Sequence, residues 1–373
     1  MSMLPMILSR RLRPSPFEDR VLENGASAFT LYNKMILPLV YESYEIEYEH
    51  LCKHVQIWDV ACERQVEIVG PDALRLVELI TPRDVSKCAV GQCKYAPLCD
   101  ENGGIINDPI ILRLAEDRFW LSIADSDVNL WVKGVAYGRG FDVRVFEPDV
   151  SPLAIQGPKA DDLMADVVGE HTRDIKFFWF IDATIAGTPV KIARSGWSGK
   201  GGFEIYLQDS AKGNDLWDLF WEAGQKYNLR PGAPNLIERV ETGLKSYGQD
   251  MTIDSNPFEA ALEKYIDLDK EAEYMSREAL AEIAKTGPEK RLVNLAIDGG
   301  QLDVMRAEWR VLDSSGKQVG VVTTRVYSPR FKSNIAFAII DAAHAAVGAS
   351  LSVDADGDVR NASVRNERWE EGA

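Results

Sequence analysis

The chain has 373 residues, 46% of them apolar and 27% charged, a composition typical of a globular protein with two or three domains and an ample core. Its 58 acidic residues outnumber its 42 basic ones and give a formal net charge of −16, which argues against general binding to nucleic acid or to an anionic membrane. An anionic ligand therefore needs a local basic patch.

The cysteines favour a reducing compartment. They are odd in number, crowd into the first third of the chain and include no CxxC pair: Cys52, Cys62, Cys88, Cys93 and Cys99. Residues 1–8 hold a short apolar run without a preceding basic region, and no later apolar run reaches membrane-spanning length. We therefore expect no signal peptide and a cytoplasmic protein.

An aromatic and acidic stretch before residue 55 predicts a helix that ends at His54, followed by a strand over Val55–Val60. His50 and His54 would share one face of that helix. Because no third histidine or carboxylate has a recognisable spacing, a histidine pair without a metal is the better interpretation, and we predict no metal site.

Two similar strand–turn–helix units follow. A strand over Gln65–Val69 leads through Gly70-Pro71 into a helix over Ala73–Ile80. The same order returns 87 residues later, where the strand Pro152–Gln156 leads through Gly157-Pro158 into a second helix. The repetition predicts two related halves of one α+β body.

The runs Tyr95–Cys99 and Ile105–Leu112 flank an Asn-Gly-Gly turn and predict a β-hairpin. Asn107 and Asp108 interrupt the second run, and Pro109 cannot donate to a ladder, so this strand lies at an edge or is bulged. A polar pair in a buried strand is costly unless it is hydrogen-bonded, which makes the pair a candidate site. The pattern alone leaves a structural bulge as an equal interpretation.

Strands are next expected over Phe119–Ile123 and Phe141–Phe146, with a helix between them that begins after Asp127. Ser122 faces away from its apolar neighbours on the first of these strands, where it could line a pocket.

A glycine-rich loop joins the predicted strands Pro189–Ala193 and Gly202–Leu207. Its glycines give it the freedom to adopt φ > 0 and to let a flat ligand approach the backbone. Alternation places Glu204 and Tyr206 on one face of the second strand. Together with Trp197 they could hold an aromatic heterocycle, because a carboxylate accepts from paired N–H donors and rings stack. The alternative is an ordinary hairpin with a solvated Glu and Tyr.

Helices are expected over residues 217–223, 235–243 and 271–286. From Arg291 onward, short alternating strands with Gly and Asp turns indicate a small β-barrel or sandwich, with a domain boundary near residue 288. The chain has no P-loop, dinucleotide fingerprint, zincin helix or GxSxG elbow.

A series of motifs resembles the glycine-cleavage T-protein (aminomethyltransferase) family, in the same order and over nearly the whole chain. They are Trp58-Asp-Val60, Gly70-Pro-Asp-Ala-Leu74, Gly103–Asp108, Gly199–Ile205, Arg239–Leu244, Tyr247–Asp250 and Ser328-Pro329. The resemblance implies an α+β fold, a three-domain cloverleaf-like ring with a C-terminal β-barrel, and tetrahydrofolate bound in a central channel. We expect domains at 1–150, 151–287, which carries the Gly-rich loop, and 288–373, the barrel.

Within the family, the sequences of three segments most resemble the dimethylsulfoniopropionate demethylase branch: Arg194–Ser198, Trp58–Gln65 and Asn235–Glu241. The paired Asp-Asp of the ordinary T-protein is Asn107-Asp108 here. The stretch Pro257–Tyr265 differs from the Pro-Phe-Glu-Cys-Gly wording of the demethylase branch.

The resemblance also implies roles for individual side chains. Glu204 would hold the N–H groups of the pterin, and the other cofactor-binding residues would be Tyr206, Trp197, Tyr95 and Ser122. Asn107 and Asp108 would lie beside the reacting atoms as the catalytic pair. The substrate-binding residues would be Trp58, Arg64 and Arg194, with Arg239 as a further candidate for pairing with a substrate carboxylate.

The expected reaction is methyl transfer from dimethylsulfoniopropionate to tetrahydrofolate, which gives 3-methylthiopropionate and 5-methyltetrahydrofolate. An aminomethyltransferase or N- or O-demethylase acting on another small substrate is the first alternative, and a non-catalytic folate-binding regulatory or repair protein is the second. The expected partner is a small-molecule methyl donor, without nucleic acid or membrane, and a homodimer is left open.

Overall fold

The computed structural model describes residues 9–302, 308–366, 368 and 369, so the expectation for residues 1–8 lies outside the described chain. Its contacts divide the chain into two units, which we describe separately. The first unit comprises residues 1–65, 147–196 and 200–234, and the second comprises residues 66–146, 197–199 and 235–373.

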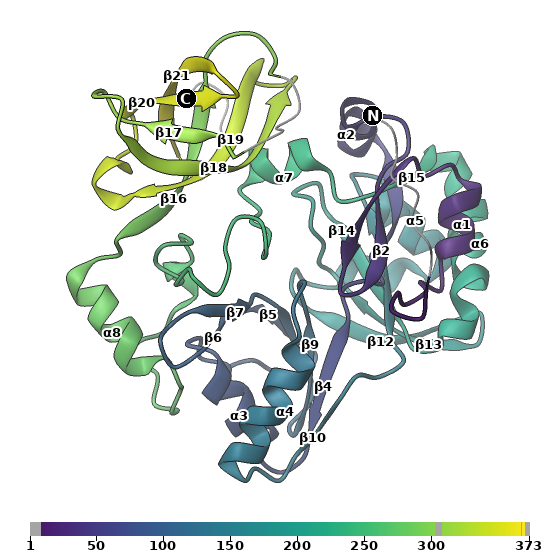
Figure 1. The fold of residues 1–373 in the computed structure, drawn as a ribbon. Coiled ribbons are helices and arrows are strands. Elements are labelled where there is room, and N and C mark those ends of the chain that lie inside the picture. Colours follow the sequence, from purple (N-terminus) through teal and green to yellow (C-terminus); the bar gives the residue numbers. More distant parts are fainter. Residues whose placement is uncertain (1–8, 303–307, 367, 370–373) are drawn as a thin grey trace. The chain divides into compact units, whose positions relative to one another are not determined.

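The first unit is built on a six-stranded sheet in the order β12-β13-β14-β11-β3-β15 (Figure 1). Its strands are β3 (Val55–Asp59), β11 (Ser151–Gln156), β12 (Phe180–Ile185), β13 (Thr188–Ala193), β14 (Gly202–Leu207) and β15 (Leu229–Gly232). All neighbours are antiparallel except β15 and β3. A hairpin of β1 (Ala28–Tyr32) and β2 (Met35–Val40) accompanies this sheet.

Helices cover the apolar face of this sheet. Side chains of α1 (Glu18–Glu23), α5 (Ala160–Val167) and α6 (Gly213–Gly224) form one core with the apolar strand residues. On the opposite face, α2 (Tyr44–Lys53) begins at Ser43, whose side chain accepts from the N–H of Ile46. Leu51 of α2 packs with Trp58 in a small apolar cluster on this face.

The second unit holds a five-stranded sheet in the order β10-β4-β9-β8-β5, a two-stranded sheet of β6 and β7, and four α-helices among its described residues. The strands are β4 (Gln65–Val69), β5 (Cys93–Tyr95), β6 (Leu98–Cys99), β7 (Ile105–Asn107), β8 (Ile110–Ala115), β9 (Arg118–Ser122) and β10 (Arg144–Phe146). The helices are α3 (Ala73–Ile80), α4 (Val128–Arg139), α7 (Leu236–Thr242) and α8 (Arg277–Thr286). Side chains of α3 and α4 pack on the sheet in a core of their own.

The C-terminal strands close into a barrel in the order β16-β19-β18-β17-β20-β21 (yellow-green in Figure 1), which confirms the predicted barrel. They are β16 (Lys290–Ile297), β17 (Arg310–Leu312), β18 (Gln318–Ser328), β19 (Ser333–Asp341), β20 (Ser350–Ala355) and β21 (Asp358–Arg365). Barrel closure removes the exposed sheet edges that short strands would otherwise leave.

The predicted helix over residues 271–286 was too long, because α8 begins only at Arg277. The residues before it pair elsewhere: Tyr274 is buried, and the N–H of Met275 donates to the carbonyl of Leu79 on α3. The predicted strand Phe141–Phe146 is likewise shortened to β10, because the N–H of Phe141 still donates to Ala136 in α4.

The two strand–GlyPro–helix units share one backbone device. Gly70 and Gly157 both have positive φ, +142° and +119°. A Cβ on Gly70 would lie 2.5 Å from the carbonyl oxygen of Asp142, and one on Gly157 would collide with the carbonyl oxygen of His54. Both turns therefore require glycine for conformation and for space.

We expect Gly157→Ala to lower the free energy of unfolding by about 2–4 kcal/mol, because it adds backbone strain and a collision with a carbonyl that cannot move freely. Gly138→Ala is the matched control, since Gly138 lies in α4 and a Cβ added there would meet no atom within 4 Å. That variant should gain about 0.5–1 kcal/mol. Urea unfolding of both variants measures the difference, and equal stabilities would contradict the assignment.

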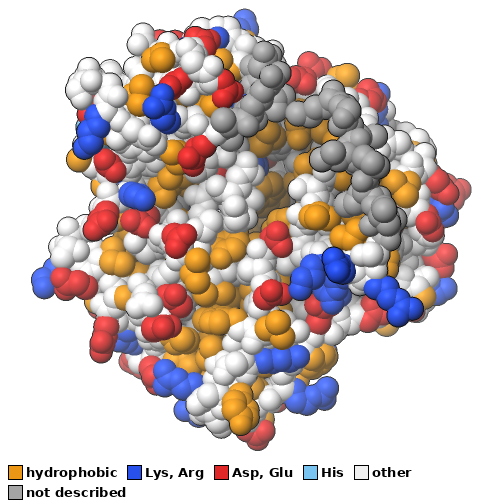
Figure 2. Space-filling model, in the orientation of Figure 1, with side chains coloured by type: hydrophobic (Ala, Val, Ile, Leu, Met, Phe, Trp, Pro, Cys, Tyr) orange, Lys and Arg blue, Asp and Glu red, His pale blue; other side chains and the backbone are white. Residues whose placement is uncertain are grey.

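Among the described residues, no helix is both long and apolar enough to cross a bilayer. On the face drawn in Figure 2, acidic and basic side chains are interspersed among polar and apolar ones. On this face, a binding site for an anion would therefore depend on a small group of basic side chains and not on a surface of one sign.

Candidate functional site

Two predicted site residues, Glu204 and Trp58, lie on the same face of the first unit's sheet. Glu204 pairs with Ala154 on β11 and with Ala193 on β13, and Ala154 in turn pairs with Trp58 on β3. Residues directly opposite on neighbouring strands share a face, so Glu204 and Trp58 are separated by one strand, about 10 Å across the sheet. The small side chain of Ala154 between them leaves room for a flat group.

The predicted alternation along β14 is confirmed. Phe203 and Ile205 belong to the apolar core of the first unit, while Glu204 and Tyr206 lie on the other face. Glu204 is 6% exposed and Tyr206 is 0% exposed. The alternative of a solvated Glu and Tyr on an ordinary hairpin is therefore wrong.

Glu204 is held by two hydroxyl donors that meet the same oxygen. Ser195 Oγ donates to Glu204 Oε2 at 2.5 Å, and the Tyr206 hydroxyl donates to it at 3.2 Å. Burial raises the pKa of Glu204, while these two hydrogen bonds oppose the rise. Among the described residues, no hydrogen bond reaches Oε1, which leaves this oxygen to accept from a ligand.

Gln156 supports the glycine loop through two hydrogen bonds. Its Nε2 donates to the carbonyls of Ser195 and Phe203, each at 3.3 Å. A Cβ on Gly202 would lie 2.6 Å from Gln156 Nε2, and one on Gly196 would collide with the same amide. These two glycines are required because the loop backbone lies directly on a buried side chain, and the resulting fit fixes the position of Ser195.

We expect Ser195→Ala to weaken tetrahydrofolate binding about tenfold, because it removes a charge-assisted hydrogen bond that orients Glu204. Tyr206→Phe should have a smaller effect, since its bond to Glu204 is longer. Because both hydroxyls serve one oxygen, the double variant should deviate from additivity in a binding titration. Strict additivity would contradict a shared role.

In the second unit, the predicted strand Ile105–Leu112 is broken into β7 and β8 at Asp108-Pro109. The first piece pairs with β6, and the second enters the five-stranded sheet between β9 and β5. Pro109 has no N–H for a ladder, so the chain changes sheets at this point. The break leaves Asp108 outside both ladders.

Asp108 accepts a hydrogen bond of 2.9 Å from the Tyr95 hydroxyl. Burial raises the pKa of Asp108 to about 7, with the Tyr95 bond opposing the rise and the charge of Asp250 adding to it. Tyr247 lies close enough that Asp108 contributes to raising its pKa, after burial. This carboxyl group therefore titrates near neutral pH, as a group that accepts or releases a proton in a reaction must.

Asn107 is fully buried, and both ends of its amide are engaged. Its Nδ2 donates to Ser126 Oγ at 2.9 Å, and its Oδ1 accepts from the N–H of Ala124 at 3.0 Å. These are the contacts of a residue that anchors the loop before α4. A direct role for Asn107 beside the reacting atoms stays a prediction.

The remaining predicted cofactor ligands of the second unit occupy separate positions. Ser122 is 5% exposed and pairs with Ile110 across β8 and β9. Trp197 lies with its ring centroid 5.7 Å from the guanidinium of Arg239. Gly199 packs on the end of α7, where a Cβ would lie 2.7 Å from Thr242. Trp197 is therefore positioned by α7.

Each of the three arginines considered for a substrate carboxylate has a carboxylate partner in the described chain. Arg64 bonds to Glu147 at 2.5 Å, and Arg194 makes two bonds to Asp161 at 2.7 and 2.9 Å. The third, Arg239, is 3% exposed and bonds to Asp250 at 2.7 Å. A substrate carboxylate would have to share or displace one of these partners.

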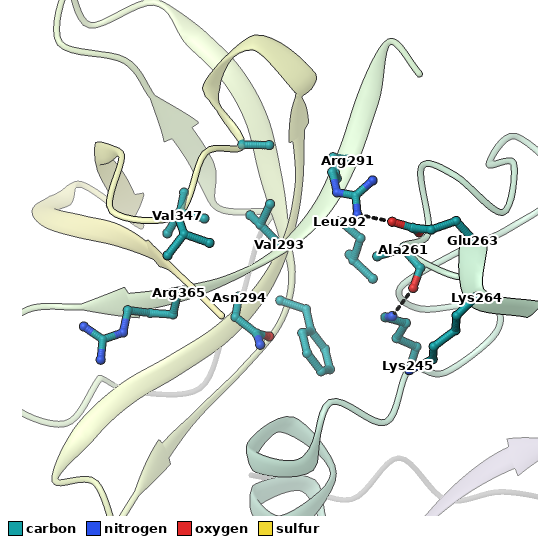
Figure 3. Close-up of a pocket in the computed structure, with 13 residues that line it drawn as sticks. Lys245, Ala261, Glu263, Lys264, Arg291, Leu292, Val293, Asn294, Val347 and Arg365 are labelled. Atoms are coloured by element: carbon teal, nitrogen blue, oxygen red, sulfur yellow. Dashed lines mark hydrogen bonds and ion pairs between the residues drawn. The ribbon is translucent and has the colours of Figure 1, made fainter. Parts of the chain in front are cut away.

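A pocket of about 250 Å³ lies within the second unit, between β16 of the barrel and the segments that carry Lys245 and Lys264 (Figure 3). Besides these two lysines, Arg291 and Arg365 line it, against the single acidic residue Glu263, which pairs with Arg291. In a chain of net charge −16, this is a local surface of the sign that an anion requires. No residue of the predicted site lines it.

The histidine pair lies on α2 and at its end, as predicted, with ring centroids 5.0 Å apart. His50 Nε2 lies 2.8 Å from the carbonyl oxygen of Asn228. Within the described ranges, no group of three or more His, Cys, Asp or Glu is arranged to hold a metal ion.

Four residues near these clusters were missed by sequence reasoning as site residues: Ser195, Gln156, Tyr247 and Asp250. Ser195 directly precedes the first loop glycine, and Tyr247 and Asp250 belong to a motif already noted. The sequence therefore held a signal for each of these three residues. Gln156 gave none, because its role depends on a loop about forty residues away in the chain.

Two family models match the chain: the GCVT N-terminal domain over residues 17–270 and the glycine cleavage T-protein C-terminal barrel domain over residues 290–368. The dimethylsulfoniopropionate demethylase DmdA of Ruegeria pomeroyi is 47% identical over 361 residues, covering 97% of this chain and 98% of that protein. An aminomethyltransferase of Alkaliphilus metalliredigens is 32% identical, covering 87% and 91% of the two chains.

Among solved structures, the glycine cleavage system aminomethyltransferase T of Bartonella henselae superposes with a TM-score of 0.87 at 26% identity, covering 96% of this chain and 98% of that one. This confirms the predicted aminomethyltransferase fold. The two family models, the nearly full-length relatives and the shared fold agree. The chain belongs to the glycine-cleavage T-protein (aminomethyltransferase) family.

Proposed function

We propose that the chain is a tetrahydrofolate-dependent dimethylsulfoniopropionate demethylase. It transfers one methyl group from the sulfonium to tetrahydrofolate and yields 3-methylthiopropionate and 5-methyltetrahydrofolate. The observation that carries the proposal is the 47% identity to a dimethylsulfoniopropionate demethylase over nearly the whole of both chains. The aminomethyltransferases compared with it are less similar, at 32–33% identity.

The chemistry around Glu204 supports tetrahydrofolate as the co-substrate. Its carboxylate is buried, its Oε2 is fixed by two hydroxyls, and its Oε1 faces no donor among the described residues. Paired N–H groups of a pterin match such an oxygen. We assign pterin binding to Glu204, with Tyr206, Trp197, Tyr95 and Ser122 as further cofactor-binding residues.

Tetrahydrofolate supplies the secondary amine, N5, that accepts the methyl group. The transfer breaks one S–CH₃ bond, whose electron pair returns to sulfur, and forms one N–CH₃ bond. Because a sulfonium is already activated, alignment of the two partners supplies most of the help, about 7–11 kcal/mol for a well-oriented pair. Trp58 would stabilise the sulfonium by a cation–π contact, and Arg64 or Arg194 would meet the substrate carboxylate.

The amine loses one proton after methyl transfer. We assign its acceptance to Asp108, whose pKa of about 7 allows the carboxylate to be ionised at neutral pH and to be reprotonated in turn. Asn107 would hold the loop that follows β9 in place. The replacement of the first aspartate of the T-protein pair by an amide favours simple methyl transfer over aminomethyl transfer.

Several expectations stay predictions. They are the domain limits at 150 and 287, the absence of nucleic-acid binding, and the homodimer. A cytoplasmic location is supported by the cysteines, since all five are thiols outside any disulfide and four of them are buried.

The purified protein, mixed with tetrahydrofolate and dimethylsulfoniopropionate, should form 5-methyltetrahydrofolate and 3-methylthiopropionate in equal amounts, measured by mass spectrometry. Tetrahydrofolate binding without either product would move the search to other methyl donors, with dimethylglycine and a methoxy-aromatic compound next. Tight folate binding without turnover of any methylated compound would favour the folate-binding regulatory or repair protein.

A further inference from the structure

A buried ion pair of the second unit takes no part in the methyl transfer described above. Arg239 lies on α7 and Asp250 in the segment that follows it, and their side chains are 4% and 0% exposed. Arg239 Nη1 lies 2.7 Å from Asp250 Oδ2. Burial of two charges costs several kcal/mol, which their attraction offsets only when further hydrogen bonds satisfy both groups. The contacts of the pair therefore indicate what it holds in place.

Asp250 uses its whole capacity to accept hydrogen bonds. Besides Arg239, its Oδ2 accepts from the N–H of Ser246 at 2.9 Å. Its Oδ1 accepts from two hydroxyls of β18, those of Thr323 at 2.8 Å and Thr324 at 2.6 Å. Thr324 Oγ1 in turn accepts from Arg239 Nη2 at 2.6 Å, which closes a ring of hydrogen bonds. This ring fixes the carboxylate and the guanidinium in one orientation each.

The guanidinium of Arg239 lies close to two aromatic rings. Its central carbon is 5.7 Å from the ring centroid of Trp197 and 5.6 Å from that of Phe337 on β19. A guanidinium at this distance from a ring attracts it by a cation–π contact. Because Arg239 is held by the ion pair, the pair also sets the position of Trp197, which is assigned to pterin binding.

The segment that carries Asp250 also packs beside the proposed proton acceptor. Met251, the next residue, belongs to one apolar cluster with Ile105 of β7, and Tyr95 packs against that cluster. The Tyr95 hydroxyl donates to Asp108 at 2.9 Å. After burial, the charge of Asp250 is a further cause of the raised pKa of Asp108. Asp250 therefore acts on Asp108 through packing and through its charge.

We propose that Arg239 and Asp250 form a positioning pair for the methyl transfer, in which Arg239 sets the ring of Trp197 and Asp250 sets the surroundings of Asp108. This role rests on the proposed function, because it requires a bound pterin and a proton for Asp108 to accept. The pair acts through its neighbours, since the four hydrogen bonds to Asp250 leave it no acceptor site for a ligand.

The first test is Asp250→Asn in the full-length protein, with tetrahydrofolate and dimethylsulfoniopropionate as substrates. The variant removes a negative charge near Asp108 and leaves the guanidinium of Arg239 without its counter-charge. Both changes favour the ionised form of Asp108. The rising limb of the pH profile of kcat/KM, expected near pH 7 in the parent, should therefore move about 0.5–1 pH unit lower.

Glu78→Gln is the matched control. Glu78 and Lys270 form another buried ion pair of the same unit, with side chains 4% and 1% exposed and 2.5 Å between Oε2 and Nζ. Its neutralisation likewise leaves a buried cation without its counter-charge, so it reproduces the loss of stability. The limb should stay near pH 7 in this variant, because the charge that raises the pKa of Asp108 is that of Asp250.

Arg239→Lys keeps both charges and carries the test if Asp250→Asn does not fold. A lysine has no planar fork with which to reach Asp250 and Thr324 together, and it presents no guanidinium to Trp197. The dissociation constant of tetrahydrofolate, measured by calorimetry, should rise about threefold to tenfold while the limb stays in place. Arg310→Lys, at a half-exposed Arg–Asp pair on β17, should bind like the parent.

Thermal unfolding verifies which variants are folded. A parent chain without turnover would overturn the reaction and this role together. With turnover in the parent, any of three results would overturn this role alone: an unmoved limb in folded Asp250→Asn, an equal movement in Glu78→Gln, or an unchanged dissociation constant in Arg239→Lys.

Discussion

Replacing Glu204 by alanine is expected to reduce kcat/KM for tetrahydrofolate about 100-fold or more. The carboxylate is buried, and each charge-assisted hydrogen bond that it would make to the pterin contributes about 1.5–3 kcal/mol. The loss should appear mainly as weaker binding, because the same bonds hold the ground state and the transition state. Calorimetric titration with tetrahydrofolate and steady-state kinetics measure the two effects separately.

Glu204→Gln keeps the shape of the side chain but replaces one acceptor by a donor, so it should lose nearly as much affinity. Glu222→Gln is the matched control, since Glu222 is exposed on α6. Full affinity and turnover in Glu204→Ala, with the fold verified by circular dichroism, would show that the pterin is held elsewhere.

Asp108→Asn is expected to lower kcat about 100-fold, the lower end of the range for a general base. In the parent chain, kcat/KM should rise with pH to a plateau above about pH 7, because the proton acceptor must be ionised and burial raises the pKa of Asp108 to about 7. The variant should lose this limb of the profile. An unchanged pH profile would remove Asp108 from the reaction, whatever the effect on kcat. Asp269→Asn, at an exposed aspartate, serves as the control.

The same pKa has a consequence for stability. Because the folded-state pKa of Asp108 lies above its ordinary value, the folded chain holds the proton more tightly than the unfolded chain does. The stability due to this group is therefore fully present below about pH 4 and is lost as pH rises to about 7. Asp108→Asn should lack this loss, so its stability relative to the parent should be higher at pH 8 than at pH 5 in urea unfolding.

The local sequence pattern was sufficient to predict which side chains share a face wherever one side of a strand is buried. The alternation of β14 predicted that Glu204 and Tyr206 share a face, because a period of two leaves no other arrangement once Phe203 and Ile205 are in the core. Likewise Pro109 predicted the irregularity of its strand, since it has no N–H to donate. The change from one sheet to another at that point could not be predicted, because it depends on which strands lie alongside.

Contacts between residues far apart in the chain could not be predicted from the sequence. The pairs Arg64–Glu147 and Arg194–Asp161 join residues 83 and 33 positions apart, so no local spacing indicates that these guanidinium groups are already paired. The raised pKa of Asp108 similarly depends on burial and on the charge of Asp250.

Gln56 connects α2 to the face of the sheet that carries Glu204. Its Nε2 donates to the carbonyl of Glu47 on α2 at 3.0 Å, and its Oε1 accepts from Trp58 Nε1 at 2.9 Å on the face that carries Glu204. A displacement of α2 that shifts Gln56 therefore alters the hold on Trp58, the side chain proposed to meet the sulfonium. Thermodynamic linkage makes the effect reciprocal, so the position of α2 that best holds Trp58 is also the one that a bound methyl donor stabilises.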